Sequence, residues 1–265
     1  YKRQSSMRYS ALADSKCIRA GLVFASGKLE EQMDEAVLID VATSIELMHT
    51  YSLIHDDLPA MDDDGMRRGQ ASNHVEFNEA TAILAGDALQ ALAFETIAAS
   101  KGMTDAHKVE AVKILAGACG HEGMVLGQQF DLDAEKNASL NIELIHELKT
   151  AKLIQVALTM PYLGNEIYNK TQELLNDIGA KIGLAFQIMD DVLEVSSDSV
   201  TLGKSNLSDI TNKKMTYVSV YGLEESIHKA EALSSFCIEQ VRENFELNKS
   251  NELIELMNLM VSRSN

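Results

Sequence analysis

The sequence predicts an all-α protein, and three observations support that prediction. Apolar residues recur at the three- and four-residue spacing of a helix along most of the chain, whereas alternation with a period of two is absent over any useful length. The 265 residues include only two prolines, Pro59 and Pro161, so helices are seldom interrupted. Alanine, leucine, methionine, glutamate and lysine are abundant, and these side chains lose little rotamer freedom in a helix.

Each expected helix carries apolar residues three or four apart and stops where helix-breaking or turn-forming residues gather. The breaks fall at Gly27-Lys28, Asp64-Gly65, Lys101-Gly102, Gly164-Asn165, Ser196 to Gly203 and Asn248 to Asn251. The expected helical stretches are Val37 to Leu53, Ala80 to Ala98, Val109 to Leu115, Ile142 to Leu158, Leu174 to Leu193, Ile227 to Phe245 and Leu253 to Met260. We expect roughly eight to ten helices joined by short loops.

The chain is expected to form one domain spanning residues 1–265. Hydrophobic residues make up 46% of the sequence, which is enough for a large core. There is no long linker rich in proline, glycine or serine, and no convincing internal repeat. Because the chain begins at Tyr1 rather than at methionine, we expect its N-terminus to be incomplete.

Charge and cysteine usage exclude several functions. A formal net charge of -17 makes a general nucleic-acid binder improbable, so any anionic substrate must be captured by local cations or metal. Cys17, Cys119 and Cys237 are widely spaced and indicate neither a disulfide framework nor a zinc site, which fits a cytoplasmic protein. The apolar stretch Thr81 to Ala99 is interrupted by polar residues, which argues against stable membrane insertion.

Two acidic clusters indicate metal chemistry. Asp56 to Asp64 and Asp190 to Glu194 each follow an apolar helical stretch, so their helices are expected to run through the core and face one another across a cavity. Clustered carboxylates repel one another unless cations neutralise them, and oxygen-only ligands favour Mg²⁺ or Mn²⁺. Arg67-Arg68 follows closely and suits a phosphate group. The alternative is that such runs are merely solvated helix ends.

Spacing within the clusters is compatible with shared ligands. Asp190 and Glu194 are four residues apart and would project from the same helix face. Asp56 and Asp62 are six apart and would diverge on a regular helix, but Pro59 breaks the hydrogen-bond ladder between them. A looped-out Pro59-Ala60 would bring the two carboxylates back into approximate alignment.

Long segments of the chain resemble trans-isoprenyl diphosphate synthases, and within that family most closely the bacterial farnesyl diphosphate synthases. The matching segments are SALADSKCIRAGLVFASG (10–27), LIHDDLPAMDDD with RRG and EATAILAGDAL (within 47–89), GMVLGQQFDLDAE (123–135), ELKTAKLI (147–154), FQIMDDVLEV (186–195), TLGKSNLSD (201–209) and NKKMTYVSVYG (212–222). The resemblance implies a single antiparallel helical bundle around a deep cavity, usually a homodimer. It also implies head-to-tail condensation of isopentenyl diphosphate with an allylic diphosphate, dimethylallyl or geranyl, by Mg²⁺-assisted ionisation.

The same resemblance assigns roles to individual residues. The expected metal ligands, for about three Mg²⁺ ions, are Asp56, Asp57, Asp62, Asp190, Asp191 and Glu194. The expected isopentenyl diphosphate pocket is Lys16, Arg19, His49 and Arg68. The expected contacts to the allylic diphosphate are Arg67, Lys149, Lys204 and Lys214, and the oxygen dipoles beside the allylic carbon are Thr150 and Gln187. The residues expected to act in catalysis itself are Asp56, Asp62, Arg67, Lys149, Thr150, Gln187, Asp190 and Lys204.

Product length is expected to depend on Tyr51, with Ser52 beside it. Tyr51 precedes Asp56 by five residues, which places its ring below the metal site, where it would block a growing tail. We therefore expect a C15 product, farnesyl diphosphate, with the C20 product of a geranylgeranyl diphosphate synthase as the alternative.

The chain departs from the family pattern at several positions of the isopentenyl diphosphate pocket and at one metal position. Asp14-Ser15 replaces Gly-Gly, Cys17 replaces Arg and Ala20 replaces Pro, while Glu194 stands where Asp is usual. Two other functions compete with that of the enzyme. A catalytically silent subunit would share the fold but commonly loses an acidic motif, and a class I terpene cyclase would carry a different second motif.

Overall fold

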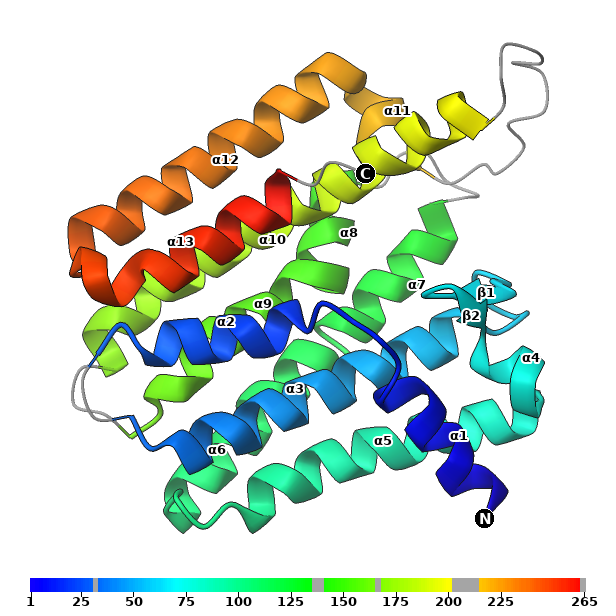
Figure 1. Cartoon of the computed structure of the whole chain (residues 1–265), viewed down its shortest axis with the longest axis horizontal. Helices are drawn as coiled ribbons and strands as arrows, with labels where there is room; N and C mark the ends of the chain where they lie inside the picture. Colours follow the sequence, from blue (N-terminus) through cyan, green and yellow to red (C-terminus); the bar gives the residue numbers. More distant parts are fainter. Residues whose placement is uncertain (31–32, 135–140, 165–167, 202–214, 263–265) are drawn as a thin grey trace.

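The described part of this computed structural model is almost entirely helical (Figure 1). It comprises residues 1–30, 33–134, 141–164, 168–201 and 215–262, with side chains of 168–170 and 197–201 left out. Within these residues the α-helices are α1 Lys2–Ala11, α2 Ile18–Gly27, α3 Glu35–Asp56, α4 Asn73–Phe77, α5 Glu79–Ala99, α6 Asp105–Cys119, α7 Met124–Ala134, α8 Ile142–His146, α9 Lys152–Thr159, α10 Tyr168–Thr201, α11 Tyr217–Tyr221, α12 Leu223–Asn244 and α13 Leu247–Val261. The predicted all-α class is confirmed, but roughly eight to ten helices was too few.

The central element is α3, which packs along α5 and against α2. It starts where the Asp34 side chain accepts a hydrogen bond from the backbone N–H of Ala36, an N-cap that satisfies an otherwise unpaired donor. The Ser44 hydroxyl donates to the carbonyl oxygen of Ala93 at 2.8 Å, which fixes the two helices relative to each other. The first acidic cluster begins at the last residue of this helix, Asp56.

A second layer is built from α9 and α10, with α12 and α13 packed on the outer side of α10 (Figure 1). The predicted stretch Ile142 to Leu158 is interrupted, because a π-helical turn, Glu147–Ala151, separates α8 from α9. Such turns are rare and often mark functional sites. Gly183 allows α10 to pack closely against the π-turn, since a Cβ at this position would lie 2.6 Å from the Cβ of Ala151.

A two-stranded hairpin, β1 Met66–Arg67 and β2 Gln70–Ala71, follows the first acidic cluster. Arg68 and Gly69 form its loop with φ values of 54° and 77°, which is the left-handed geometry that tight hairpins require. The strands are too short to produce a detectable period of two, so the sequence analysis missed them. The hairpin presents Arg67 and Arg68 beside the end of α3.

Most of the buried apolar residues in the described part of the chain form one continuous cluster. Both α3 and α5 are long and apolar enough to cross a membrane when judged by length and composition alone. We interpret them as helices of a soluble bundle, because α3 runs through this core and α5 packs along it. That residues 1–265 form a single domain stays a prediction.

Candidate active site

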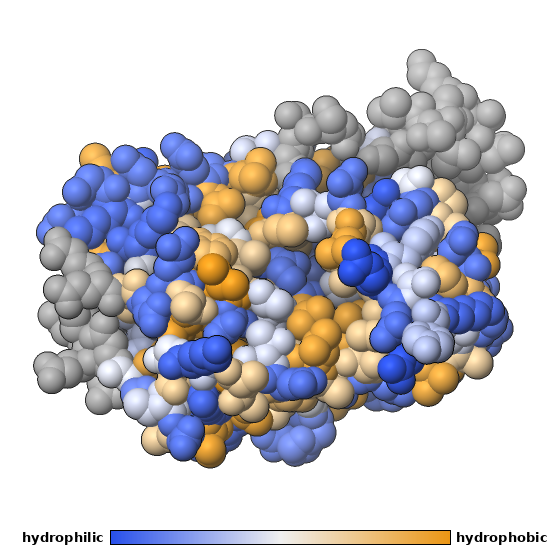
Figure 2. All heavy atoms as spheres, turned by 60° about the horizontal axis from the view of Figure 1, so that its bottom comes forward, coloured by the Kyte–Doolittle hydropathy of each residue, from blue (hydrophilic) through white to orange (hydrophobic). Residues whose placement is uncertain are grey.

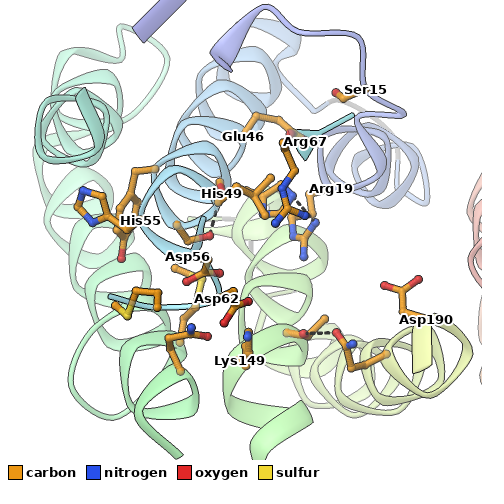
Figure 3. Close-up of a pocket in the computed structure, with 18 of the residues that line it drawn as sticks. Ser15, Arg19, Glu46, His49, His55, Asp56, Asp62, Arg67, Lys149 and Asp190 are labelled. Atoms are coloured by element: carbon orange, nitrogen blue, oxygen red, sulfur yellow. Dashed lines mark hydrogen bonds between the residues drawn. The ribbon is translucent and has the colours of Figure 1, made fainter. Parts of the chain in front are cut away.

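A cavity of about 660 Å³ opens where the ends of α2 and α3 meet the hairpin, α7, the π-turn and α10. Carboxylates from both acidic clusters line it, together with several cationic side chains. Figure 3 shows Asp56 and Asp62 on one side of the cavity and Asp190 on the other. The two clusters, 134 residues apart when counted from Asp56 to Asp190, therefore meet across one cavity, as the sequence analysis expected.

The chain folds back after α3 so that Asp56 and Asp62 share the cavity. The helix ends at Asp56, and the backbone N–H of Asp62 donates to the carbonyl oxygen of Asp56 at 2.9 Å. Pro59 lies in the intervening turn, as the expected disruption requires. Burial raises the pKa of Asp56 to about 6, and the charge of Asp62 adds to that rise while Lys149 opposes it. A cation bound here would relieve this repulsion.

Asp57 faces away from the cavity and is held by Arg67. Only 3% of its side chain is exposed, and its Oδ1 accepts a hydrogen bond from Arg67 Nε at 2.9 Å and a second from Nη2. The expectation that Asp57 binds metal directly is not supported by this geometry. Its carboxylate instead fixes the guanidinium of Arg67, which does line the cavity.

The carboxylates of the second cluster also differ in their surroundings. Asp190 lines the cavity, whereas Asp191 is buried and accepts hydrogen bonds from protein groups, and Glu194 is exposed one helical turn beyond. Neither Asp191 nor Glu194 lines the cavity. For Asp191 the expected role as a direct metal ligand is therefore not supported, because neighbouring helix positions point about 100° apart. Glu194 lies four residues after Asp190, on nearly the same helix face, and its role as a metal ligand stays a prediction.

The expected isopentenyl pocket residues gather at one end of the cavity. Lys16, Arg19, His49 and Arg68 all line it. An Arg19 guanidinium nitrogen lies 3.1 Å from His49 Nε2. Burial, and next the positive charge of Arg19, hold the pKa of His49 well below its ordinary value, so the ring stays neutral there. The end of the cavity is thus cationic without a charged histidine.

One departure from the family pattern, Ala20 in place of proline, has a local explanation. The backbone N–H of Ala20, which a proline would lack, donates to Glu46 Oε1 at 2.9 Å. This bond ties the start of α2 to α3. Cys17 precedes α2 with a φ of 42°, and its sulfur lies 3.0 Å from the Ser15 hydroxyl.

The π-turn places Lys149 and Thr150 next to one another on the cavity wall. Lys149 Nζ donates to Asp131 Oδ2 at 2.6 Å, and Figure 3 shows Lys149 next to Asp62. The Thr150 hydroxyl donates to Gln187 Oε1 at 2.8 Å. Lys204 and Lys214, the two remaining expected diphosphate contacts, lie outside the described residues.

The apolar end of the cavity is closed from the α3 side. Tyr51 is 5% exposed, and Tyr51 and Ser52 both line the cavity. The ring of His55 turns toward α5, where Nε2 lies 3.1 Å from the carbonyl oxygen of Ile83 (Figure 3). His55 therefore packs between α3 and α5.

Sequence reasoning missed two polar residues of α7. Gln128 lines the cavity and is 7% exposed, and within the described part of the chain neither of its amide atoms has a hydrogen-bond partner. Asp131, which pairs with Lys149, lies one turn further along the same helix face. This three-residue spacing beside apolar positions was the available signal.

The donor set fits Mg²⁺. Among the described residues no three Asp, Glu, His or Cys side chains come together as a closed metal cage. Mg²⁺ is usually bound by one or two carboxylates, with phosphate oxygens and water completing an octahedron. Asp56 and Asp62 on one wall and Asp190 on the other supply such incomplete sets, which a bound diphosphate would complete.

Close packing of α7 on the π-turn predicts a sharp difference between two glycine substitutions. A Cβ at Gly127 would lie 2.3 Å from the backbone nitrogen of Lys149, whereas a Cβ at Gly117 of α6 meets nothing within 4 Å. Gly127→Ala is expected to lower the free energy of unfolding by about 1–3 kcal/mol. Gly117→Ala should raise it by about 0.5–1 kcal/mol, because alanine favours helix. Urea denaturation measures both, and equal effects would contradict the close approach.

Comparison with known proteins places these features in a family context. The Polyprenyl synthetase family model matches residues 2–257. The Escherichia coli farnesyl diphosphate synthase is 43% identical over 233 residues, which cover 86% of this chain and 78% of that protein. The chloroplastic geranylgeranyl pyrophosphate synthase 7 of Arabidopsis thaliana is 38% identical over 269 residues, covering 100% of this chain and 77% of that one.

A solved structure agrees with this fold. The Helicobacter pylori geranyltransferase complexed with magnesium and isoprenyl diphosphate superimposes with a TM-score of 0.86 at 33% sequence identity. The superposition covers 98% of this chain and 88% of the other. The expected antiparallel bundle around a cavity is therefore confirmed.

Proposed function

The chain belongs to the polyprenyl synthetase family and is a trans-prenyltransferase, and we propose that it makes farnesyl diphosphate. In the proposed reaction an allylic diphosphate, dimethylallyl or geranyl, ionises and its carbon is attacked by the double bond of isopentenyl diphosphate. The observation that supports this most strongly is the meeting of Asp56, Asp62 and Asp190 around one cavity with a cationic end.

Departure of the diphosphate builds negative charge on its oxygens, and the cavity offers positive charge at that place. Arg67 and Lys149 are each held by a carboxylate, Asp57 and Asp131 respectively, so their donors are positioned before the substrate enters. Such preorganised charge stabilises the transition state without reorganisation. When bound, Mg²⁺ supplies further neutralisation of the leaving group. We propose about three such ions, with Mn²⁺ as a substitute.

The opposite change occurs at the allylic carbon, where positive charge develops. Thr150 and Gln187 present oxygen atoms to this part of the cavity, and neither is a strong nucleophile. Apolar side chains of Phe186, Met124 and Leu132 line the same cavity and exclude water from the cation. We propose that the departing diphosphate takes the final proton, so no side-chain base is assigned.

One assay tests this function directly. The protein is incubated with Mg²⁺, radiolabelled isopentenyl diphosphate and geranyl diphosphate, and the alcohols released from the products are sized by chromatography. Labelled farnesol that disappears on chelation of Mg²⁺ is the expected result. No incorporation would favour a silent subunit, which the retained acidic residues argue against.

Tyr51 is proposed to limit the product to fifteen carbons. Because the buried ring closes the apolar end of the cavity, Tyr51→Ala is expected to shift the main product to C20 or longer. Tyr51→Phe keeps the ring and should still give the C15 product. Chromatography of the released alcohols distinguishes them. Wild-type geranylgeraniol would support the alternative of a geranylgeranyl diphosphate synthase, and unchanged farnesol from Tyr51→Ala would contradict the role of the ring.

We propose that the protein is a cytoplasmic homodimer that associates through α5. Ile83, Leu84 and Leu92 of this helix are 43%, 56% and 37% exposed. Figure 2 shows apolar side chains spread among hydrophilic ones on the face that carries α5. An exposed apolar face on a long helix is typical of an association surface.

A charge on this face should separate the subunits. Leu84→Glu is expected to convert the dimer to a monomer, because an unpaired carboxylate would be buried in the contact. Leu247→Glu of α13 is the matched control, since Leu247 is 61% exposed on the opposite layer. Analytical ultracentrifugation measures the mass. A wild-type monomer, or a dimeric Leu84→Glu variant, would contradict the proposed surface.

A further inference from the structure

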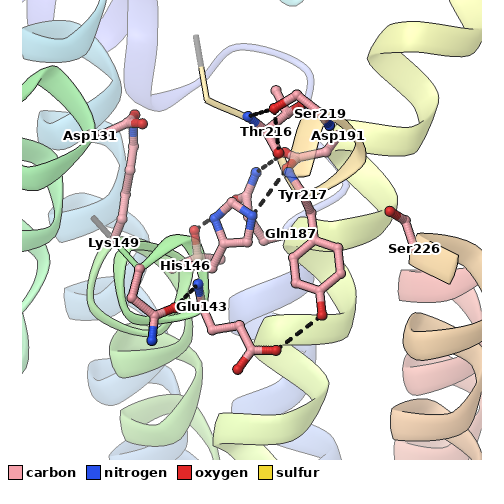
Figure 4. Close-up of polar contacts among 12 residues, drawn as sticks. Asp131, Glu143, His146, Lys149, Gln187, Asp191, Thr216, Tyr217, Ser219 and Ser226 are labelled. Atoms are coloured by element: carbon pink, nitrogen blue, oxygen red, sulfur yellow. Dashed lines mark hydrogen bonds and ion pairs between the residues drawn. The ribbon is translucent and has the colours of Figure 1, made fainter. Parts of the chain in front are cut away.

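Asp191 occupies the centre of a buried hydrogen-bond network that joins α8, α10 and α11 (Figure 4). Its side chain is 6% exposed. Oδ2 accepts from the backbone N–H of Tyr217 at 2.7 Å and lies 3.1 Å from His146 Nε2. Oδ1 accepts from Gln187 Nε2 at 3.3 Å. Both oxygens of this carboxylate are therefore occupied by protein donors.

The network is anchored on the side away from the cavity. The hydroxyl of Tyr217 donates to Glu143 Oε1 at 3.0 Å, and its ring stacks at 6.3 Å from the ring of His146. Thr216 starts α11 with a capping box, which holds the N–H of the following residue in place. Asp191 is thus fixed by two elements other than its own helix.

An ionised carboxylate accepts hydrogen bonds and donates none, so it determines the orientation of each partner. Gln187 must turn its NH₂ group toward Asp191, which leaves its carbonyl oxygen to accept from Thr150. Thr150 uses its only hydroxyl hydrogen in that bond, at 2.8 Å. The lone pairs of the Thr150 hydroxyl are then available to the cavity that this residue lines.

We propose that Asp191 is a positioning residue that orients Gln187 and Thr150 as acceptors toward the developing allylic cation, and that it does not bind magnesium. The inference rests on the proposed prenyl transfer. The proposal gives two adjacent carboxylates different roles. Asp190 lines the cavity beside the diphosphate, whereas Asp191 orients the oxygen dipoles of Gln187 and Thr150 beside the allylic carbon.

Asp191→Asn is the informative substitution because an amide must present a donor on one side. If its NH₂ group faces Gln187, the Gln187 amide flips and the Thr150 hydroxyl turns its hydrogen toward the cation. If its NH₂ group faces Tyr217, two donors meet in a buried place, which is costly. The second arrangement would leave Gln187 and Thr150 as in the wild type, but the two facing donors disfavour it, so the first arrangement, which opposes the cation, should prevail. We expect kcat to fall about a hundredfold, while the KM for geranyl diphosphate and the Mg²⁺ requirement stay close to wild type.

A binding measurement separates positioning from a merely structural role. Calorimetry compares an allylic analogue carrying an ammonium group at the cationic position with a neutral, non-ionising thiolodiphosphate, both with Mg²⁺. Asp191→Asn should weaken binding of the ammonium analogue selectively. Asp177→Asn, an exposed site on the same helix, should leave both affinities and kcat unchanged. Asp190→Asn should weaken both analogues and raise the Mg²⁺ requirement.

The outcomes are distinct. Equal weakening of both analogues in Asp191→Asn, with a lower melting temperature, would overturn the inference in favour of a structural role. A raised Mg²⁺ requirement like that of Asp190→Asn would overturn it in favour of a metal ligand. A wild-type protein without prenyl transfer would overturn the proposed function as well, whereas either of the first two results with an active wild type would overturn this inference alone.

Discussion

Asp56→Asn is expected to lower kcat for farnesyl diphosphate formation about a thousandfold, the largest loss among the single substitutions considered. The change keeps the size of the side chain but removes the charge that holds the cation against the leaving diphosphate. Burial already raises the pKa of Asp56 to about 6, which indicates a carboxylate placed where only a cation makes its charge stable. Steady-state kinetics over a range of Mg²⁺ concentrations measures the loss.

Asp63→Asn is the matched control for this prediction. Asp63 belongs to the same acidic run but is exposed and does not line the cavity, and its φ of 53° suits asparagine as well as aspartate. The kcat of the Asp63→Asn variant should remain close to that of the wild type. Comparable losses in both variants would mean that the acidic run acts through its overall charge, and the specific role of Asp56 would be wrong.

Arg67→Met is expected to reduce both activity and stability. Activity should fall about a hundredfold, because a preorganised donor to the diphosphate is lost. Stability should fall by about 2–3 kcal/mol, below the usual cost of an unpaired buried charge, because the Arg67 side chain is itself 35% exposed. Asp57, with a side chain 3% exposed, would be left without its guanidinium partner. Urea denaturation and steady-state kinetics measure the two effects.

A double variant separates these two effects. Arg67→Met combined with Asp57→Asn removes the uncompensated charge and should recover most of the stability, but it should not recover activity. Arg242→Met, which removes an exposed cation on α12, should change neither quantity. Recovery of activity in the double variant would show that Arg67 acts only through the fold, and its contact with the diphosphate would be wrong.

The sequence predicted the meeting of the two acidic clusters because each followed an apolar helix that had to pass through the core. It also predicted the bend at Pro59 that aligns Asp56 with Asp62, since a proline there cannot continue the helical ladder. The backbone bond from Asp62 to Asp56 has this origin. These features depend on the spacing of apolar residues and on the conformational preferences of single residues, and both can be read from the sequence.

The different roles within each cluster could not be predicted in the same way. Asp57 and Asp191 stand next to cavity residues in sequence, but their direction depends on partners such as Arg67, His146 and Tyr217 that lie on other elements. The π-turn at Glu147–Ala151 was missed because a single extra residue per turn hardly alters the apolar pattern. Tertiary contacts decided these points.

The central claim is that carboxylates on two walls grip one diphosphate through shared divalent ions. Calorimetric binding of inorganic diphosphate tests it most directly, in the wild type, Asp56→Asn, Asp190→Asn and the double variant, with and without Mg²⁺. Binding that requires Mg²⁺, with losses in the single variants that do not add in the double variant, is the expected result. Diphosphate binding that is independent of Mg²⁺, or strictly additive losses, would contradict a shared site.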